Sequence, residues 1–490
     1  MSMTLFRVRF ARRCAGVLAV AALAALVPGC SVNPATGKQQ LNLISESQEV
    51  AMGREADPGI VAQMGLYPDQ ALQAYVQALG SGLAAKSERP HLPWTFRVLD
   101  DPLVNAFALP GGFVYVTRGI MAHLESEAEL VGILGHEIGH VTARHSVNQL
   151  SKQQLAGLGI GIGMIVSPRM AQLGDLAQTG MGLLFLKYSR DDERQADGLG
   201  LRYVLRGNYD PREIPNVFGV LQRVSQASGG GRAPSWMATH PDPGQRQQTM
   251  AAEVARLQVD LSGTVVNARP YQQRLDGMVF GPNPREGYFE GDRFLHPDLA
   301  FSLDLPAGWK RENQKQALVA QSEAGDAILQ MKLVDEASPA EAARKFVAQE
   351  GLTGGRVETG RVGGFTAASS LFEVPQDSGD LGGRVTFVRY NDRTYQLLGL
   401  TLTEKWSTYK GDLEGTLNSF RRVTDRKVLD VQPSRLALVD LDRRMTLAEF
   451  QKRYPSTVPI QTLGLINRLD SQGNLATNDL AKRVVGGPGG

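Results

Sequence analysis

The stretch from Ser126 to Leu150 constrains this chain more than any other, because it combines the pattern of a buried helix with two histidines one turn apart. Ser126 and Glu129 have the spacing of a capping box, which predicts that a helix starts here. Apolar residues lie on nearly all sides of its first half: Leu130, Val131, Ile133, Leu134, Ile138 and Val141. Such a helix is buried, and its two imidazoles therefore need polar partners.

The two histidines belong to the sequence His136-Glu137-Ile138-Gly139-His140, which is the H-E-x-x-H pattern of zinc peptidase helices. Spacing of four places His136 and His140 on one face, where they can hold one tetrahedral metal ion, usually zinc. Glu137 lies about 100° around the helix from His136, where it can take a proton from a water molecule at the metal. The alternative is a buried helix whose histidines only form core hydrogen bonds.

Two further features of this helix carry expectations. Gly132, Gly135 and Gly139 each cost about 1 kcal/mol relative to alanine in a helix interior, so we expect another backbone to pack closely against them. His145 lies about 180° from His136 on a continuous helix. It cannot join the same site from there, and we interpret it as structural or exposed.

The N-terminus predicts export and lipid attachment. Arg7, Arg9, Arg12 and Arg13 precede an apolar run of 14 residues, which suits a signal peptide and is short for a membrane span of about 20. Val27-Pro28-Gly29-Cys30 resembles a bacterial lipobox. We therefore expect residues 1–29 to be a lipoprotein signal peptide, Cys30 to carry lipid and residues 30–45 to form a tether. Ordinary cleavage or an uncleaved anchor are the alternatives. Ser31, rather than Asp, implies the outer membrane.

Cysteine and charge counts exclude several classes. The chain has two cysteines, Cys14 and Cys30, so its mature form would have no disulfide, and zinc would have to use histidine and carboxylate. Loss of four arginines with the signal peptide would leave 48 of the 52 basic residues against 50 acidic ones. A slightly acidic protein gives no support to nucleic-acid binding.

Two later motifs supply further candidate residues for the zinc site. Glu193 and Asp197 are spaced i, i+4, as on one helix face; a glutamate can be a third zinc ligand, and a carboxylate one turn on can fix the tautomer of a ligating histidine. Taken alone, this spacing usually marks a solvent-exposed face of a helix. His240-Pro241 follows, with Arg246 six residues after the histidine. Taken alone, His240 could equally be an ordinary loop histidine.

In this order the three motifs resemble those of the zinc metallopeptidase family of HtpX, the CAAX prenyl protease and the periplasmic protease BepA. The resemblance runs from Glu46 to Leu257. It implies one zinc ion per chain. The ligands would be His136, His140 and Glu193, with Glu137 as general base and Asp197 as the partner of a ligating histidine.

The same resemblance implies roles for three further segments. His240 and Arg246 would lie over the site and stabilise the tetrahedral intermediate; in some relatives the equivalent histidine occupies the open zinc position at rest. The strand formed by Phe113, Val114, Tyr115 and Val116 would be a sheet edge that pairs with extended substrate. A plain hairpin is the alternative interpretation of that strand.

The overall fold class predicted is α+β and multidomain. A mainly helical zincin-like peptidase domain with a small edge sheet spans residues 46–264, and a linker spans residues 265–292. Residues 293–425 are expected to form an antiparallel sheet with two packed helices, which resembles the PsbP/Mog1-like fold. Residues 426–490 resemble a LysM module and could bind peptidoglycan, although the glycine usual before Thr446-Leu447 is absent.

These observations together predict a zinc metalloendopeptidase, held at the outer membrane by lipid and facing the periplasm, that acts in protein quality control. Its substrates would be misfolded envelope proteins, an expectation that comes from the family. The first alternative is a chaperone or assembly factor of the envelope with a regulated or little-used protease site. The intact Glu137 argues against a purely structural zinc site, which needs no base. A second alternative, a cell-wall binding module, rests only on the C-terminal segment.

Overall fold

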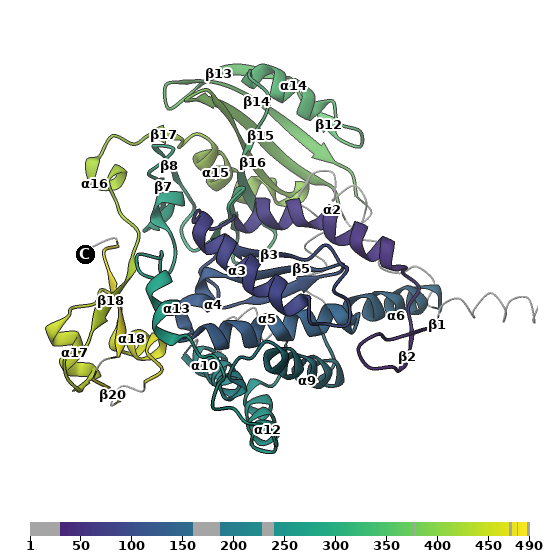
Figure 1. The fold of residues 1–490 in the computed structure, drawn as a ribbon. Coiled ribbons are helices and arrows are strands. Elements are labelled where there is room, and N and C mark those ends of the chain that lie inside the picture. The colour runs from purple at the N-terminus through teal and green to yellow at the C-terminus, as the bar shows by residue number, and fades with distance from the viewer. Residues whose placement is uncertain are drawn as a thin grey trace, which may run out of the picture. The chain divides into compact units, whose positions relative to one another are not determined.

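A computed structural model of the chain describes residues 30–159, 187–227, 240–376, 379–469, 473–477 and 479–487. The expected signal peptide, residues 1–29, lies outside the described residues. The chain divides into two compact units (Figure 1). The first runs to Arg274, and the second holds the residues from Leu275 on together with the short segments 61–65 and 100–102. Within the described ranges, no helix has both the length and the apolar character needed to cross a membrane.

The first unit is mainly helical. Its helices are α2 (Glu46–Met64), α3 (Gln70–Ala84), α4 (Arg118–His123), α5 (Glu127–Thr142), α6 (His145–Gly159), α9 (Arg190–Arg206), α10 (Ile214–Ala227), α12 (Pro243–Ala255) and α13 (Ala268–Arg274). A small hairpin, β1 (Cys30–Val32) and β2 (Gln39–Leu41), precedes them. The strands β3 (Thr95–Leu99), β4 (Ala106–Leu109) and β5 (Phe113–Thr117) form a sheet.

This sheet has β5 in its centre, which differs from the predicted edge strand. The order is β3-β5-β4, with β5 parallel to β3 and antiparallel to β4. Gly111 and Gly112, both at positive φ, turn the chain back and join β4 to β5 as a hairpin. The backbone of Phe113, Val114, Tyr115 and Val116 is therefore paired on both sides, and every side chain of β5 is buried. These four residues have no edge to offer a substrate.

The helix predicted from Ser126 is confirmed, but it is shorter than the pattern suggested. The Ser126 hydroxyl accepts the Glu129 N–H at 3.2 Å, while the Glu129 carboxylate accepts the N–H of Glu125 at 2.6 Å. All residues of α5 are buried. The helix ends at Thr142, because Arg144 adopts a left-handed conformation with φ 56°, and α6 then begins at His145.

The close backbone contact predicted from the glycines of α5 is confirmed at two of the three positions, and the neighbour is α9. A Cβ at Gly139 would lie 2.9 Å from the carbonyl oxygen of Ala196, and one at Gly135 would lie 3.2 Å from that of Gly200. A Cβ at Gly200 would in turn lie 3.0 Å from the backbone nitrogen of His136. The third glycine of α5, Gly132, faces the side chain of Ile214 instead.

The second unit is rich in sheet. Its strands are β6 (Tyr288–Glu290), β7 (Arg293–His296), β8 (Phe301–Asp304), β9 (Lys310–Asn313), β10 (Ala317–Gln321), β11 (Ala327–Val334), β12 (Thr353–Gly354), β13 (Glu358–Val362), β14 (Phe365–Val374), β15 (Leu381–Tyr390), β16 (Arg393–Leu402), β17 (Arg421–Arg422), β18 (Arg435–Asp440), β19 (Met445–Thr446), β20 (Asn474–Leu475) and β21 (Leu480–Val485). Its helices are α14 (Pro339–Val347), α15 (Trp406–Leu417), α16 (Arg426–Leu429), α17 (Leu447–Arg453) and α18 (Ile460–Ile466).

The main sheet of this unit is antiparallel, in the order β12-β14-β15-β16-β11-β10-β9, with β13 paired to β14. The two helices predicted to pack on it do so from opposite faces. Phe346 of α14 contacts Phe372 and Phe387, whereas Leu413 and Leu417 of α15 lie against Gly399. Residues 387 and 399 point to opposite faces in the observed register.

The segment expected to be a linker, residues 265–292, is not plain linker in the structure. It contains α13, a 3-10 turn at Pro284–Glu286 and β6. Tyr271 of α13 is fully buried, and its hydroxyl donates to the Met121 carbonyl at 2.9 Å. Burial of a tyrosine with a satisfied hydroxyl explains why this helix forms against the first unit's core. Nearer the C-terminus, β18, α17, α18 and β21 follow one another, and β18 pairs antiparallel with β21.

We predict that Gly139→Ala destabilises the metal-free protein by about 1–3 kcal/mol, because its Cβ meets a backbone oxygen that cannot move aside. Gly198→Ala is the matched control: it lies in α9 with no atom near its Cβ position, and should stabilise by up to about 1 kcal/mol. The midpoint of thermal unfolding checks both. Equal shifts for the two variants would contradict the close helix contact.

Candidate metal centre

Two imidazoles of α5 form the base of the centre. His136 and His140 are buried, and their Nε2 atoms lie 3.0 Å apart. Burial is the largest influence on the His140 ring and lowers its pKa. Two Nε2 atoms at this separation cannot both carry protons, so at least one of the two rings presents a lone pair toward the other.

Helix α9 brings two carboxylates to these rings. It begins at Ser189 with a full capping box to Asp192, which starts the helix one turn before Glu193. The Glu193 oxygens lie 3.5 Å from the Nε2 atoms of His136 and His140. Asp197, one turn on, places Oδ1 2.9 Å from Nδ1 of His136. That contact favours the tautomer of His136 with its proton on Nδ1, which leaves Nε2 free for a metal.

His240 closes the site from a separate segment. It is buried, with Nδ1 2.9 Å from Glu193 Oε1 and 3.4 Å from His136 Nε2. Its Nε2 lies 3.7 Å from Glu137 Oε1. The residues after it fix its position: Asp242 adopts a left-handed conformation with φ 58°, and Pro243 starts α12. The structure thus brings His240 into the site, as the resemblance implied.

The donor set fits a zinc ion. His136, His140, Glu193 and His240 each offer one ligand atom, all within 4.8 Å of one another. Ligand atoms about 2.0–2.1 Å from a tetrahedral zinc lie roughly 3.4 Å apart, and the separations of 3.0, 3.4 and 3.5 Å are near this value. The set contains nitrogen and carboxylate oxygen without thiolate, as expected for a chain with this cysteine content.

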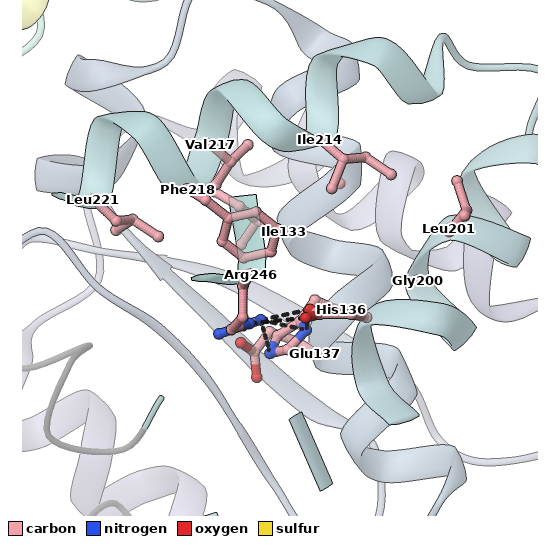
Figure 2. A pocket seen from close by; sticks show the side chains of 12 residues that line it. Ile133, His136, Glu137, Gly200, Leu201, Ile214, Val217, Phe218, Leu221 and Arg246 are labelled. Atoms are coloured by element: carbon pink, nitrogen blue, oxygen red, sulfur yellow. Dashed lines mark hydrogen bonds and ion pairs between the residues drawn. The ribbon is translucent and has the colours of Figure 1, made fainter. Parts of the chain in front are cut away.

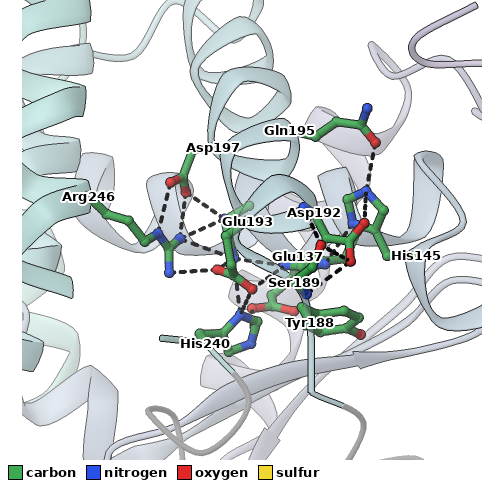
Figure 3. A network of polar contacts seen from close by, with 12 residues as sticks. Glu137, His145, Tyr188, Ser189, Asp192, Glu193, Gln195, Asp197, His240 and Arg246 are labelled. Atoms are coloured by element: carbon green, nitrogen blue, oxygen red, sulfur yellow. Dashed lines mark hydrogen bonds and ion pairs between the residues drawn. The ribbon is translucent and has the colours of Figure 1, made fainter. Parts of the chain in front are cut away.

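Arg246, on α12, contacts the two carboxylates of α9, Glu193 and Asp197 (Figure 3). Its Nε and Nη2 atoms donate to Asp197 at 2.8 and 2.5 Å, and its Nη1 lies 2.7 Å from Glu193 Oε2. Its guanidinium also stacks over the Phe218 ring at 4.5 Å. Burial alone would raise the pKa of Asp197, but the charge of Arg246 holds that pKa well below its usual range. Arg246 thus fixes the orientation of both carboxylates.

Glu137 has the environment of a proton carrier. Its side chain is buried, and its Oε1 forms no hydrogen bond among the described residues. Burial is the largest influence and raises the pKa of this carboxyl, partly offset by His240 and His136. A carboxyl whose pKa is raised above its usual range holds a proton more readily, which suits a group that both accepts and releases one.

Two contacts of the His140 ring, with His145 and Tyr188, escaped the sequence-based interpretation. Of the two interpretations of His145, structural or exposed, the structure agrees with the structural one. His145 is buried; its Nδ1 lies 2.9 Å from Nδ1 of His140, and its Nε2 lies 2.7 Å from Oε1 of Gln195. The Tyr188 ring stacks on His140 at 4.0 Å. The left-handed conformation of Arg144 ends α5 and turns His145 back toward it. No short pattern marks that break, although H-x4-H with Gln195 beside Glu193 offered a weak signal.

Comparison with known proteins agrees with this geometry. The family model "Peptidase family M48" matches residues 70–254. The beta-barrel assembly-enhancing protease of Yersinia pestis is 31% identical over 45% of this chain and 47% of its own length. The mitochondrial metalloendopeptidase OMA1 of Arabidopsis thaliana is 34% identical over 37% of this chain and 36% of its own length. The chain therefore matches less than half the length of these relatives.

A solved structure, cyanobacterial PsbP from Synechocystis sp. PCC 6803, aligns with 26% of this chain and 91% of its own, at 13% identity and a TM-score of 0.23. That score is too low to support an argument. The family match is different, because it covers the helices that carry His136, His140, Glu193 and Arg246. Residues 70–254 of this chain are therefore similar to the peptidases of family M48.

Proposed function

We propose that this protein is a zinc-dependent metalloendopeptidase. One observation carries the proposal: four ligand atoms of His136, His140, Glu193 and His240 converge within 4.8 Å, and the buried carboxyl of Glu137 lies beside them. The named relatives, a protease and a metalloendopeptidase, support the same reaction class. A purely structural zinc site would give no reason to bury a carboxyl oxygen without a hydrogen bond at this place.

The chain's own groups can perform both proton transfers of peptide hydrolysis. Zinc, when bound, would polarise the water and the peptide carbonyl. Glu137 would take the proton of the attacking water and pass it to the leaving amine, for which its raised pKa suits it. Asp197 and His145 would hold the His136 and His140 rings in place, and Arg246 would hold Glu193 and Asp197. We therefore infer a positioning role for Arg246.

His240 would occupy the fourth ligand position at rest. Its Nδ1 lies 3.4 Å from Nε2 of His136, at the spacing of a shared metal. A catalytic zinc keeps one position for water and substrate, so His240 would leave that position before cleavage. Exposure of the site would then depend on movement of the segment around His240.

The substrate backbone would pair with β4 rather than with β5. Within the described residues β4 is paired only with β5, and a substrate strand would add to its other edge. The strand also packs against α5, which carries Glu137. An extended polypeptide that adds to a sheet edge is held by main-chain hydrogen bonds without demands on its sequence.

The biological setting is a further part of the proposal. The relatives named beta-barrel assembly-enhancing protease support a role in quality control of misfolded envelope proteins. The lipobox-like sequence before Cys30 supports an outer-membrane lipoprotein facing the periplasm. We keep residues 293–425 as a PsbP/Mog1-like domain. We also keep residues 426–490 as a LysM-like module with peptidoglycan as its ligand, since β18 and β21 of this segment form their own sheet.

Glu137→Gln tests the activity. The variant keeps the size of the side chain but removes the proton acceptor, so degradation of an unfolded protein should fall at least about 10²-fold. Zinc content, measured by atomic emission, should equal that of the wild type, because Glu137 is not a ligand. Undiminished degradation by a zinc-loaded variant would exclude the proposed role of Glu137.

The ligand set predicts a graded loss of metal. His136→Ala and His140→Ala should each abolish stoichiometric zinc, and Glu193→Gln should weaken zinc binding more than Asp197→Asn does. The weaker effect for Asp197 is expected because it acts through His136, and such partners typically contribute about 10–100-fold in affinity. Competition with a chromogenic chelator gives the four dissociation constants. The reverse order of Glu193 and Asp197 would show that their roles are exchanged.

His240→Ala separates a resting ligand from a transition-state donor. If His240 only closes the fourth position, the variant keeps zinc and cleaves a permissive peptide faster than the wild type. If it stabilises the oxyanion, kcat should fall by about 10²–10³. We expect the faster reaction, because His240 is buried against Glu193 and the ligand ring of His136. A kcat equal to that of the wild type would contradict both roles.

A further inference from the structure

The two histidine ligands of α5 are oriented by different neighbours. The His136 ring contacts charged groups: Nη2 of Arg246 lies 3.2 Å from its Nδ1 (Figure 2), and Oδ1 of Asp197 lies 2.9 Å from the same atom. The His140 ring has another buried imidazole beside it, since Nδ1 of His145 lies 2.9 Å from Nδ1 of His140. The orientation of His140 therefore depends on where the chain places His145.

Gln195 determines which nitrogen of His145 carries a proton. Its Oε1 is an acceptor and lies 2.7 Å from Nε2 of His145, so this Nε2 donates, and Nδ1 of the neutral ring keeps a lone pair. The Nδ1–H of His140 donates to that lone pair, which leaves Nε2 of His140 free for the metal. His145 can do this only because the chain turns sharply after α5. On a continuous helix it would lie about 180° from His136.

The turn is made at Arg144, and its side chain is held by Glu49. Arg144 has φ 56°, a left-handed conformation that is uncommon for residues other than glycine. Its Nε donates to Glu49 Oε2 at 2.9 Å, and its Nη2 donates to the Ile44 carbonyl at 2.8 Å. Glu49 lies on α2 and is 1% exposed. Loss of the turn would take the guanidinium away from a buried carboxylate, which is unfavourable.

The same buried group holds the end of α5. Arg89 donates to both Glu49 oxygens at 2.9 Å, and its Nη1 also donates to the Val141 carbonyl at 2.9 Å. Asn33 is fully buried, and its side-chain amide donates to the Ala143 carbonyl at 2.8 Å. The last carbonyls of a helix have no partner within the helix. These two side chains supply partners for the carbonyls directly before the turn.

We propose that Glu49 is a positioning residue for the metal ligand His140. It holds the left-handed turn at Arg144, and this turn places His145 where its lone pair orients the ligand ring. The inference rests on the proposed function, in which His140 binds zinc, and adds to it a residue that lies 95 positions before Arg144 in the sequence. The alternative is that the buried ion pairs of Glu49 serve only the stability of the fold.

A double-mutant cycle on zinc affinity separates the two roles, measured on the full chain by competition with a chromogenic chelator. Glu49→Gln and His145→Ala should each weaken zinc binding by about 10–100-fold, as for other partners of ligating histidines. Because Glu49 acts through His145, the double variant should bind zinc no more weakly than His145→Ala alone. Losses that multiply in the double variant, or an unchanged zinc affinity in Glu49→Gln, overturn the proposal.

Asp57→Asn is the matched control. Asp57 is also a buried carboxylate of α2; it pairs with Arg97 at 2.7 Å and accepts the Tyr115 hydroxyl at 2.7 Å. The loss of either carboxylate should lower the midpoint of thermal unfolding, but only Glu49→Gln should weaken zinc binding. An equal loss of zinc affinity in the two variants would show that zinc binding follows general stability, and would overturn the role of Glu49.

Two substitutions of Arg144 test the turn directly and cover the case in which Glu49→Gln does not fold. Arg144→Gly and Arg144→Ala both remove the guanidinium, but only glycine adopts a positive φ without steric cost. Arg144→Gly should therefore bind zinc more tightly than Arg144→Ala, and equal affinities overturn the proposal. All these results leave the proposed function intact. A wild type that binds no zinc would overturn the proposed function instead, and the role of Glu49 with it.

Discussion

The backbone contact between α5 and α9 is the interaction on which the metal centre depends. Gly139 against Ala196 and Gly135 against Gly200 allow the two helices to approach to a distance that a Cβ on either glycine of α5 would prevent. Metal ligand distances tolerate errors of about 0.2 Å, less than the displacement that a methyl group would force between two backbones. Gly135 and Gly139 weaken the helix itself, and the close contact with α9 at the site explains why the loss is tolerated.

Ion pairs hold the carboxylates that the packing of α5 against α9 brings to the metal centre. Glu193 and Asp197 are both held at the centre of the unit, and two buried carboxylates require positive charge nearby. Arg246 supplies one charge through a forked contact to both, and a divalent cation among His136, His140 and Glu193 would supply the rest. Burial raises the pKa of Glu137, whereas the positive charges of His240 and Arg246 outweigh burial at Glu193, as Arg246 does at Asp197, and hold those two pKa values below their usual range.

Residue spacing predicted which side chains of one helix share a face. It failed for contacts that depend on segments distant in the sequence. The convergence of His136 with His140, and of Glu193 with Asp197, follows from helical geometry, so those positions could be anticipated before any coordinates. The contact of His145 with His140 was not predicted, because the helix was extended through Arg144, whose left-handed conformation no neighbouring residue demands. The pattern Phe-Val-Tyr-Val of β5 predicts a strand, but whether that strand is an edge depends on β3, which pairs with it from a separate part of the chain.

The connection between His240 and α12 limits how the site can open. Arg246 sits in the first turn of α12 and holds Glu193 and Asp197, so a movement of the whole helix would disturb the ligands together with their partner. His240 can leave without that disturbance only if the bend lies between it and Pro243. Asp242 adopts a left-handed conformation there, one that aspartate adopts more often than most residues other than glycine. In the proposed resting state, a bend at Pro241-Asp242 would let His240 move while α12 stays in place.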